Sequence, residues 1–353
     1  MAEEQKEHKR RVRYKGTHPR TFSEKYKEHN PEKYADTIAK VIQKGSTPAG
    51  MHLPIMAEEI LDFFCIQPGQ QGLDATLGYG GHTRRMLEKL QGTGHIYALD
   101  VDPIESEKTE KRLRDAGFGE NRLTVKRTNF SDIDAVAEEV GTFDFVLADL
   151  GVSSMQLDNP ERGFSYKHDG PLDLRLDPSH GVPASKRLQE LTQEEIEGML
   201  RENADEPFAR EIAKAIDQIN RKKKELDTTK KLRELIEMVL EKNCPRLSAR
   251  ERRDVLKKTC QRVFQAIRID VNSEFEALDA FLEKLPSVLK PGGRVAILTF
   301  HSGEDRMVKK SFRRGMKEGV YQEITRDVIR PSAGECRKNG RARSTKMRWA
   351  IRA

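Results

Sequence analysis

The stretch Asp74-Ala-Thr-Leu-Gly78-Tyr-Gly80-Gly81-His82 decides the fold of this chain. It follows a short apolar segment, Gly72–Ala75, and precedes a segment with helical spacing at Thr83–Leu90. Glycines in such a turn permit positive φ angles and let a ligand approach the backbone closely. A helix that begins after them presents unpaired N–H groups. The stretch therefore predicts a ligand-binding turn between a buried strand and a helix.

The spacing of these glycines argues against a dinucleotide cofactor. The dinucleotide fingerprint G-x-G-x-x-G would require a third glycine at the position of Thr83. The observed spacing, D-x-x-x-G-x-G-G, suits a nucleoside ligand that carries no phosphates. S-adenosylmethionine is such a ligand, and the carboxylate of Asp74 could face its positive end.

Strands and helices alternate around this turn as far as residue 150. The further predicted strands are His95–Leu99, Leu123–Lys126 and Phe143–Leu150, and the predicted helices are Met56–Phe64, Ile104–Ala116 and Ile133–Val140. Such alternation indicates βαβ units and a parallel sheet. The last of these strands is almost continuously apolar, as expected of a strand that is covered on both faces.

The alternation stops near residue 155 and resumes with a helix at Ser273–Leu289 and a strand at Gly293–Phe300. The intervening segments with helical spacing are Leu191–Leu200, Phe208–Lys222 and Leu232–Leu240. Tyr321–Thr325 and Lys346–Ile351 could form an antiparallel pair at the sheet edge. We predict one α/β domain, in two parts at residues 51–156 and 261–353, with a basic C-terminal segment. An inserted, mainly helical domain spans residues 157–260, and a basic, partly disordered arm spans residues 1–50.

Positive charge is concentrated at both ends of the chain, whose formal net charge is +7. Residues 1–50 contain 12 Lys and Arg against 7 Asp and Glu, and residues 306–353 contain 15 against 4. Basic segments attract polyanions because neutralised phosphates release their counterions. Solvation of the surface explains such charge equally well at any one residue. The composition therefore favours a nucleic-acid partner only slightly.

The cysteines and the N-terminal segment argue against several classes of protein. No two of the four cysteines form a C-x-x-C pair and no histidines cluster near them, so neither a zinc site nor a disulfide framework is expected. Residues 1–20 lack the apolar core of a secretory signal, and the chain contains no run of about 18 apolar residues. These features predict a cytoplasmic protein without a membrane segment.

Two further positions extend the cofactor pattern. Asp100 follows the second strand, 20 residues beyond Gly80, and an acid there can bind both ribose hydroxyls. Phe130 follows the third strand, where an aromatic ring could flank an adenine. Each feature alone has an ordinary explanation as a turn glycine, a polar strand end or a core phenylalanine. Their order along the chain predicts a nucleoside cofactor.

Asp149 ends the fourth strand and is the predicted catalytic residue. Ligands bind beyond the carboxyl ends of strands in open α/β sheets, and the fourth strand of such a sheet adjoins the first, so Asp149 should lie near Gly78. An exocyclic amine is a weak nucleophile because its lone pair conjugates with the ring. A hydrogen-bond acceptor can hold the amine with this lone pair toward a methyl carbon. We expect Ser153 and Ser154 to shape the pocket around Asp149.

Blocks of sequence from about His52 to Arg348 are similar to those of one enzyme family. They are Thr76-Leu-Gly-Tyr-Gly-Gly-His82, Asp149-Leu-Gly-Val-Ser-Ser154, Glu161-Arg-Gly-Phe-Ser165, Asp169-Gly-Pro-Leu-Asp173, Phe264-Gln-Ala-Ile-Arg268-Ile-Asp-Val-Asn272, Phe300-His301-Ser-Gly-Glu304-Asp305-Arg306 and Asn339-Gly-Arg-Ala-Arg343-Ser-Thr-Lys346-Met-Arg348. The chain resembles the 16S ribosomal RNA cytosine-N4 methyltransferase family, also called RsmH or MraW. Ala75 and Gly303 depart mildly from the family pattern, which usually has Gly and Leu at these positions.

The resemblance implies a class I methyltransferase fold, a Rossmann-like and mostly parallel seven-stranded sheet with an inserted helical domain. It implies S-adenosylmethionine as cofactor and methylation of N4 of one cytidine in the decoding region of 16S ribosomal RNA, a component of the small ribosomal subunit. By matching motif positions, the cofactor contacts would be Gly80, Gly81, His82, Asp100, Phe130, Asp149 and Gln156.

Several residues outside this pattern are predicted substrate contacts. Phe164 and Tyr166 could stack on an unstacked target base, or could equally belong to the core. His301, which follows the fifth strand, is assigned to substrate positioning, with helix capping by Ser302 as the alternative. The predicted phosphate contacts are Arg262, Arg268, Arg341, Arg343, Lys346 and Arg348.

No metal site is predicted, although three carboxylates recur at intervals of four residues. Oxygen ligands of this kind suit Mg²⁺. However, Gly170-Pro171 interrupts any helix there, and Arg162 and Arg175 offer ion-pair partners, so structural pairing is the preferred interpretation. The three carboxylates are Asp169, Asp173 and Asp177.

Other functions remain open from the sequence. The chain could methylate another RNA amine, such as adenine N6, or act as a non-catalytic ribosome-assembly factor that binds RNA through its basic ends. A nicotinamide-dependent oxidoreductase is disfavoured by Thr83. Binding of S-adenosylmethionine and the identity of the modified nucleoside distinguish these functions. The sequence does not determine the oligomeric state, and a homodimer is compatible with it.

Overall fold

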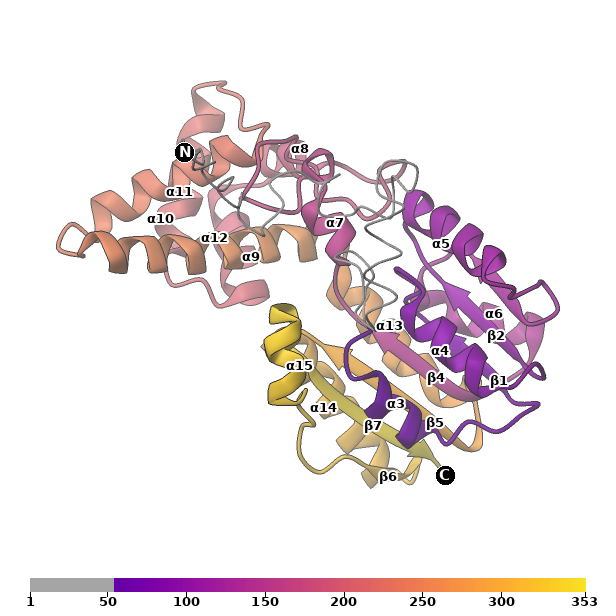
Figure 1. Cartoon of the computed structure of the whole chain (residues 1–353). Helices are drawn as coiled ribbons and strands as arrows, with labels where there is room; N and C mark the ends of the chain where they lie inside the picture. Colours follow the sequence, from indigo (N-terminus) through magenta and orange to yellow (C-terminus); the bar gives the residue numbers. More distant parts are fainter. Residues whose placement is uncertain (1–53) are drawn as a thin grey trace, which may run out of the picture. The chain divides into compact units, whose positions relative to one another are not determined.

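The computed structural model describes residues 54–353, and Pro54–Ala353 forms one compact unit (Figure 1). The arm predicted at residues 1–50 lies outside the described residues. Within the described unit, no helix has the combined length and apolar character needed to cross a membrane.

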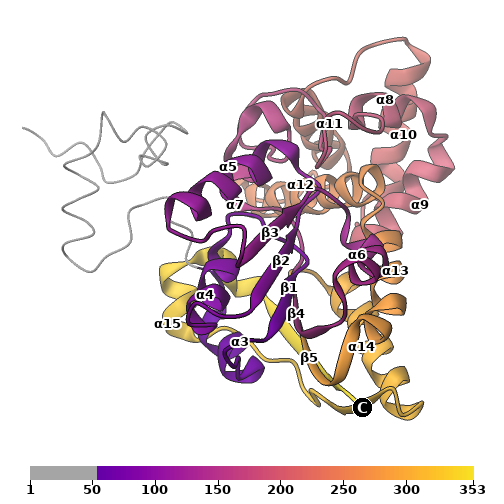
Figure 2. The same ribbon diagram turned by 90° about the vertical axis from the view of Figure 1, so that its right-hand side faces the viewer.

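A seven-stranded sheet in the order β3-β2-β1-β4-β5-β7-β6 forms the centre of this unit. Figure 2 shows β1 to β5, and Figure 1 shows β7 and β6 beside β5. Among the described strands, all neighbours pair in parallel except β7, which runs antiparallel to both β5 and β6. This order, with one reversed strand, is that of the class I methyltransferase fold, so the predicted fold class is confirmed. The strands are β1 Gln71–Asp74, β2 His95–Leu99, β3 Leu123–Lys126, β4 Phe143–Asp149, β5 Leu289–Thr299, β6 Tyr321–Ile324 and β7 Lys346–Arg352.

Helices cover both faces of the sheet, as side chains of strand β4 show. Phe145 and Leu147 pack on one face and Val146 and Ala148 on the other, because successive strand residues point to opposite faces. The first face is covered by α3 Ala57–Phe64, α4 Gly81–Lys89 and α5 Pro103–Asp115. The second is covered by α6 Ile133–Val140, α13 Glu274–Val288 and α14 Ser302–Lys317.

The helical insertion has an apolar core of its own. Its helices are α8 Ala184–Glu190, α9 Gln193–Ala204, α10 Ala209–Arg221, α11 Thr229–Asn243 and α12 Ala249–Val271. Helix α12 has 23 residues and crosses position 260, where the sequence placed the end of the insertion. Val263, Phe264 and Ile267 of α12 belong to the insertion's core, which therefore continues beyond that position.

Short elements join the two regions. Helix α7 and the 3₁₀ turn η3 lead from strand β4 into the insertion (Figure 1). Three other short elements belong to the sheet domain: the turn η2 follows β3, while α15 and η4 precede β7. Their bounds are α7 Ser154–Asp158, η3 Pro160–Arg162, η2 Phe130–Asp132, α15 Ala333–Lys338 and η4 Gly340–Ser344. These connections place the turns after β1, β2 and β4 at one edge of the sheet, beside the start of the insertion.

Candidate active site

Asp74, the last residue of β1, holds the two ends of the glycine turn together. It is almost fully buried, and its carboxylate accepts hydrogen bonds from Thr83 Oγ1 at 2.6 Å and from the Thr76 amide at 3.1 Å. Burial raises the pKa of this carboxyl above its ordinary value. The structure therefore does not support the expected contact between Asp74 and the positive end of a cofactor. Thr83, which stands where a dinucleotide fingerprint requires glycine, holds this carboxylate instead.

Gly80 must be glycine for two reasons. Its φ is +78°, a left-handed conformation that side chains disfavour. A Cβ atom there would lie 2.7 Å from Cγ2 of Thr109 on α5. The Thr109 hydroxyl also donates to the carbonyl oxygen of Gly78 at 2.7 Å, so α5 fixes the turn. Helix α4 begins at Gly81, so the amides of its first turn lie next to the glycines, as predicted.

Asp100 lies immediately after β2 and locks the same turn from the neighbouring strand. Its carboxylate accepts hydrogen bonds from the amides of Gly78 at 2.8 Å and Asp102 at 2.9 Å. Burial raises the pKa of Asp100 to about 6, although both hydrogen bonds favour the ionised form. A carboxylate retains further acceptor capacity after two such bonds, so Asp100 can still accept ligand hydroxyls.

His82 and Asp149 leave buried polar atoms without partners at this edge. The Asp149 amide donates to Thr76 Oγ1 at 2.6 Å, which ties the end of β4 to the glycine turn. The His82 ring Nε2 lies 3.6 Å from Asp149 Oδ2. Within residues 54–353, neither His82 Nε2 nor Asp149 Oδ1 has a hydrogen-bond partner, and both atoms are buried. Buried polar atoms are nearly always satisfied in proteins, so this pair fits a site that a ligand completes.

Ser153, Ser154 and Gln156 belong to the start of α7. Ser153 and Gln156 form a capping box, in which each side chain bonds the other's backbone amide. The Gln156 side-chain amide also donates to Asp102 Oδ2 at 2.7 Å. Both ends of this amide are therefore engaged within the protein, and its contact with the cofactor stays a prediction. Ser154 is buried.

Phe130 begins η2, directly after the turn that follows β3. Its ring is half-buried and meets the ring of Phe281 on α13 edge to face, with centroids 5.3 Å apart. This contact fixes one edge of the ring while part of its surface stays accessible. A role beside an adenine stays a prediction that this position permits.

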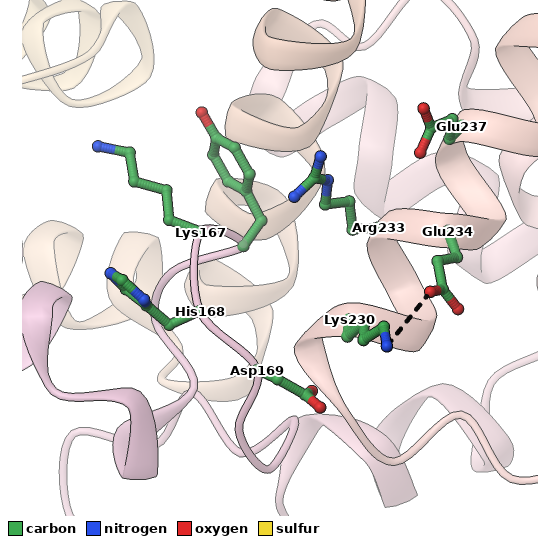
Figure 3. A pocket seen from close by; sticks show the side chains of 8 residues that line it. Lys167, His168, Asp169, Lys230, Arg233, Glu234 and Glu237 are labelled. Atoms are coloured by element: carbon green, nitrogen blue, oxygen red, sulfur yellow. Dashed lines mark ion pairs between the residues drawn. The ribbon is translucent and has the colours of Figure 1, made fainter. Parts of the chain in front are cut away.

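The two aromatic residues predicted to stack on a target base differ in exposure. Phe164 is 5% exposed and lies in the insertion's core, so it cannot stack on RNA in this arrangement. Tyr166 is half-buried, packs edge-on against Phe264, and lines a cavity of about 280 Å³ between its own loop and α11 (Figure 3). Of the two aromatic residues predicted to stack on the target base, burial excludes Phe164, and Tyr166 remains the candidate.

Arg268 and His301 are occupied by neighbouring acids. Arg268 makes a bidentate ion pair with Glu274, with bonds of 2.7 and 2.8 Å. His301 itself, rather than Ser302, caps α14 in a reciprocal box with Glu304. Burial opposes ionisation of Glu304, but the hydrogen bond and charge of His301 hold the Glu304 pKa below its ordinary value. Substrate contact by Arg268 would require this ion pair to open. His301 Nε2 is buried without a hydrogen-bond partner among residues 54–353, and its contact with substrate stays a prediction.

Two of the three carboxylates considered as Mg²⁺ ligands, Asp173 and Asp177, are engaged within the protein. Asp173 pairs with Arg175 as expected, and Asp177 accepts bonds from Ser179 and Arg127. Glu274, His301 and Glu304 offer ligand atoms within 4.8 Å of one another. However, the Arg268 guanidinium already supplies the cation beside this group, so we assign no metal to it.

The predicted phosphate contacts also divide by burial. Arg348 is buried against Asp305, and Lys346 lies 3.8 Å from the same carboxylate. Arg341 pairs with Asp158, whereas Arg343 is exposed. Arg343 is therefore the member of this set best placed to meet an RNA phosphate.

The burial of Asp102 is a feature of the site that was not predicted from the sequence. Asp102 is fully buried and pairs with Arg162, itself 7% exposed, across 2.8 Å. An Asp followed by Pro103 is a recognisable helix start, and Asp102 does cap α5. Sequence gave no sign that Arg162, 60 residues further on, would reach this carboxylate.

This geometry can be compared with known proteins. The chain matches the MraW methylase family over residues 49–353. It belongs to that family. The "Ribosomal RNA small subunit methyltransferase H 1" of Agathobacter rectalis is 64% identical over 350 residues, covering 99% of each chain. The "Ribosomal RNA small subunit methyltransferase H 2" of Alkaliphilus metalliredigens is 59% identical over the full length of both chains. The family resemblance predicted from the sequence blocks is therefore confirmed.

Two solved structures that resemble this chain are more distant from it than these relatives. TrmN from Thermus thermophilus aligns with 84% of this chain and 48% of its own, at 12% identity and a TM-score of 0.39. An rRNA methylase from Streptococcus thermophilus covers 85% of this chain and 98% of its own, at 12% identity and a TM-score of 0.38. Likenesses at this level leave the site to be argued from this chain's own residues.

Proposed function

We propose that this member of the MraW methylase family transfers a methyl group to N4 of a cytidine in the decoding region of 16S ribosomal RNA. The assignment of the chain as a ribosomal RNA methyltransferase rests on the family and on relatives of 59–65% identity that carry this name. The observation that carries the proposal is the unsatisfied pair of His82 and Asp149 beside the glycine turn.

S-adenosylmethionine is the methyl donor, and it supplies an electrophilic methyl group on a positively charged sulfur. The residues at the sheet edge fit such a group, since the glycines give close backbone approach and Asp100 and Asp149 supply negative charge. Asp100 would accept hydrogen bonds from ribose hydroxyls, and Phe130 would flank the base. The residues proposed to hold the donor are Gly80, Gly81, His82, Asp100, Phe130 and Asp149, with Gln156 as a further candidate.

Asp149 would orient the target amine. Its Oδ1 is an unused acceptor at the end of β4, and its position is fixed by the Thr76 bond to its amide. An N–H of the amine donating to this oxygen would direct the nitrogen lone pair away from the carboxylate and toward the methyl group. This role is positioning and electrostatic, and the amine proton can leave to solvent after transfer. Ser153 fixes the adjoining backbone through its capping box, and Ser154 is packed beside it.

The RNA would approach from the insertion side of this edge. Tyr166 and Arg343 are accessible candidates for base stacking and phosphate contact. A base within a folded RNA must leave its stack to reach such an edge. Recognition of the target within the small ribosomal subunit belongs to this proposal.

Identification of the product nucleoside tests the proposal. The wild-type enzyme is incubated with small ribosomal subunits that lack the modification, and the labelled RNA is digested to nucleosides. We expect the label in N4-methylcytidine. Label in N6-methyladenosine would replace the substrate assignment by another RNA amine, and absence of label with intact donor binding would favour a non-catalytic assembly factor.

A further inference from the structure

A polar cluster, mostly buried, joins the glycine turn to the helical insertion, and Gln156 is its only member with a role in the proposed function. We define the bridging cluster as Asp102, Gln156, Arg162 and Asn272. We propose that the bridging cluster couples the two regions, so that RNA held by the insertion strengthens binding of the methyl donor at the sheet edge. This inference rests on the donor site proposed above.

Asp102 is the member of the cluster that reaches the donor site. Its amide donates to Asp100 Oδ1 at 2.9 Å, so any shift of Asp102 moves the carboxylate proposed to bind the ribose. One oxygen of the Asp102 side chain caps α5 through the amides of Ile104 and Glu105. The other accepts bonds from Gln156 at 2.7 Å and Arg162 at 2.8 Å. The position of Asp100 therefore depends on residues at the start of the insertion.

Arg162 carries the connection into the insertion. One terminal nitrogen of its guanidinium holds Asp102, and the other donates to the carbonyl oxygens of Arg175 and Leu176 at 3.2 and 2.8 Å. Arginine suits this position because its planar group makes several bonds in fixed directions. A lysine could satisfy Asp102 or the carbonyls, but not both sets together.

Asn272 fixes the same segment where the chain returns from the insertion to the sheet. Its side chain accepts from the Leu176 amide at 2.7 Å and donates to the Leu174 carbonyl at 2.8 Å. Leu174 between these bonds is fully buried with φ at +61°, a conformation that costs energy for a leucine. Arg162 lies where the chain enters the insertion and Asn272 where it leaves. Both hold the strained segment 174–176 through hydrogen bonds.

The energetics favour a role in orientation over one in stability. Desolvation offsets much of the attraction in a buried ion pair, so such a pair is weak evidence of net stabilisation. The insertion has a core separate from the two cores of the sheet. The bonds of the bridging cluster give Asp100 a hydrogen-bonded connection to residues 174–176, which pack on this separate core.

The test measures binding of radiolabelled S-adenosylhomocysteine to the full chain, with and without saturating small subunits that lack the modification. We expect the subunits to tighten binding by on the order of 10-fold in the wild type, within the usual range for coupled sites. Arg162→Met should reduce this factor to less than about 2-fold. Arg162→Lys, which keeps the charge and guards against loss of folding, should retain an intermediate factor.

The matched control is Arg187→Met. Arg187 pairs with Asp270 within the insertion at 2.8 Å and makes no bond to the bridging cluster, so the variant should keep the wild-type factor. An unchanged factor in both Arg162 variants, or no factor in the wild type, would overturn the proposal. Failure of the substrate assignment would be seen separately, because this readout does not depend on which nucleoside is methylated.

Discussion

The sheet edge and the helical insertion differ in whether the side chains predicted to bind ligands already have partners within the protein. At the edge, His82 and Asp149 lie side by side with buried atoms that no residue in 54–353 satisfies. In and next to the insertion, residues expected to meet RNA are packed or paired, as Phe164 and Arg268 are. The sheet edge is thus a preformed site with unsatisfied polar atoms that a small ligand can bind. The insertion instead has an apolar core of its own and a partly accessible Tyr166, and the proposed coupling links it to the edge through the bridging cluster.

The largest effect on stability should come from breaking the bridging cluster. Arg162→Ala leaves the Asp102 carboxylate buried without its cation, which typically costs about 3–5 kcal/mol of unfolding free energy. Arg187→Ala removes a more exposed pair and should cost about 1 kcal/mol or less. Denaturant unfolding of both variants measures the difference. Equal losses would show that Arg162 is no more critical than a surface ion pair.

A second comparison sets Gly80, which precedes α4, against Gly92, which lies in the turn after the same helix. Both have positive φ, but a Cβ would contact Thr109 at Gly80 and nothing within 4 Å at Gly92. Each change to alanine should cost about 1–3 kcal/mol through backbone strain. Only Gly80→Ala should also weaken S-adenosylhomocysteine binding, by on the order of 10-fold or more (about 1.4 kcal/mol per tenfold). Calorimetric titration measures the binding, and equal affinities of the two variants would remove Gly80 from the donor site.

Asp100 should make donor binding and stability respond to pH in opposite directions. Its pKa is raised from 3.8 to about 6, chiefly by burial, with the charges of Asp102 and Asp74 acting in the same direction. Below pH 6 the carboxyl becomes protonated and can no longer accept from two ribose hydroxyls, so affinity should fall. Because the folded-state pKa exceeds the unfolded value, this group destabilises the fold above pH 6, and the penalty disappears as the pH falls toward 4.

The measurement compares the affinity of the wild type and of Asp100→Asn for S-adenosylhomocysteine between about pH 5 and pH 8, a range that brackets the Asp100 pKa of about 6. The variant should bind S-adenosylhomocysteine more weakly at pH 8, with a flatter pH dependence. A wild-type affinity that rises as the pH falls would contradict the assignment of Asp100 to the ribose.

The smallest expected effect concerns the exposed surface. Arg343→Ala should weaken RNA binding modestly and lower the slope of log affinity against log salt by about 1, without changing the nucleoside that is methylated. Arg348→Ala is not a matched control, because Arg348 is buried against Asp305. Arg330→Ala, another basic residue of the C-terminal region that is exposed, provides the comparison. A slope that Arg343→Ala leaves unchanged would remove this residue from the RNA interface.

The fold of the sheet was predictable because its signals are local. Continuous apolar segments and glycine turns marked the strands, and β2 and β3 have the predicted bounds. Helix α12 was not predicted, since its first half is densely charged from Arg250 to Lys258 and its apolar face becomes clear only after Thr259. The predicted boundary of the insertion at residue 260 falls inside α12 because this helix was not predicted.

The site was predictable where the backbone defines it and unpredictable where distant side chains meet. The glycine turn, Asp100 and Asp149 follow from the strand ends of one sheet, and the structure brings them together. The Arg162–Asp102 pair depends on the path of the chain through the insertion, which the sequence does not display. The Arg268–Glu274 pair, by contrast, is local and was missed because helix α12, which carries Arg268, was not predicted.

The most direct test of the account is the separation of donor binding from methyl transfer at Asp149. Asp149→Ala should reduce tritiated methyl transfer to small subunits by on the order of 100-fold or more. Binding of S-adenosylhomocysteine should weaken far less, because Gly80, Gly81 and Asp100 remain to hold it. Asp144→Ala, on the same strand but paired with Lys290 away from the edge, should transfer at close to the wild-type rate. Undiminished transfer by Asp149→Ala would show that this carboxylate does not orient the amine and would contradict the central claim.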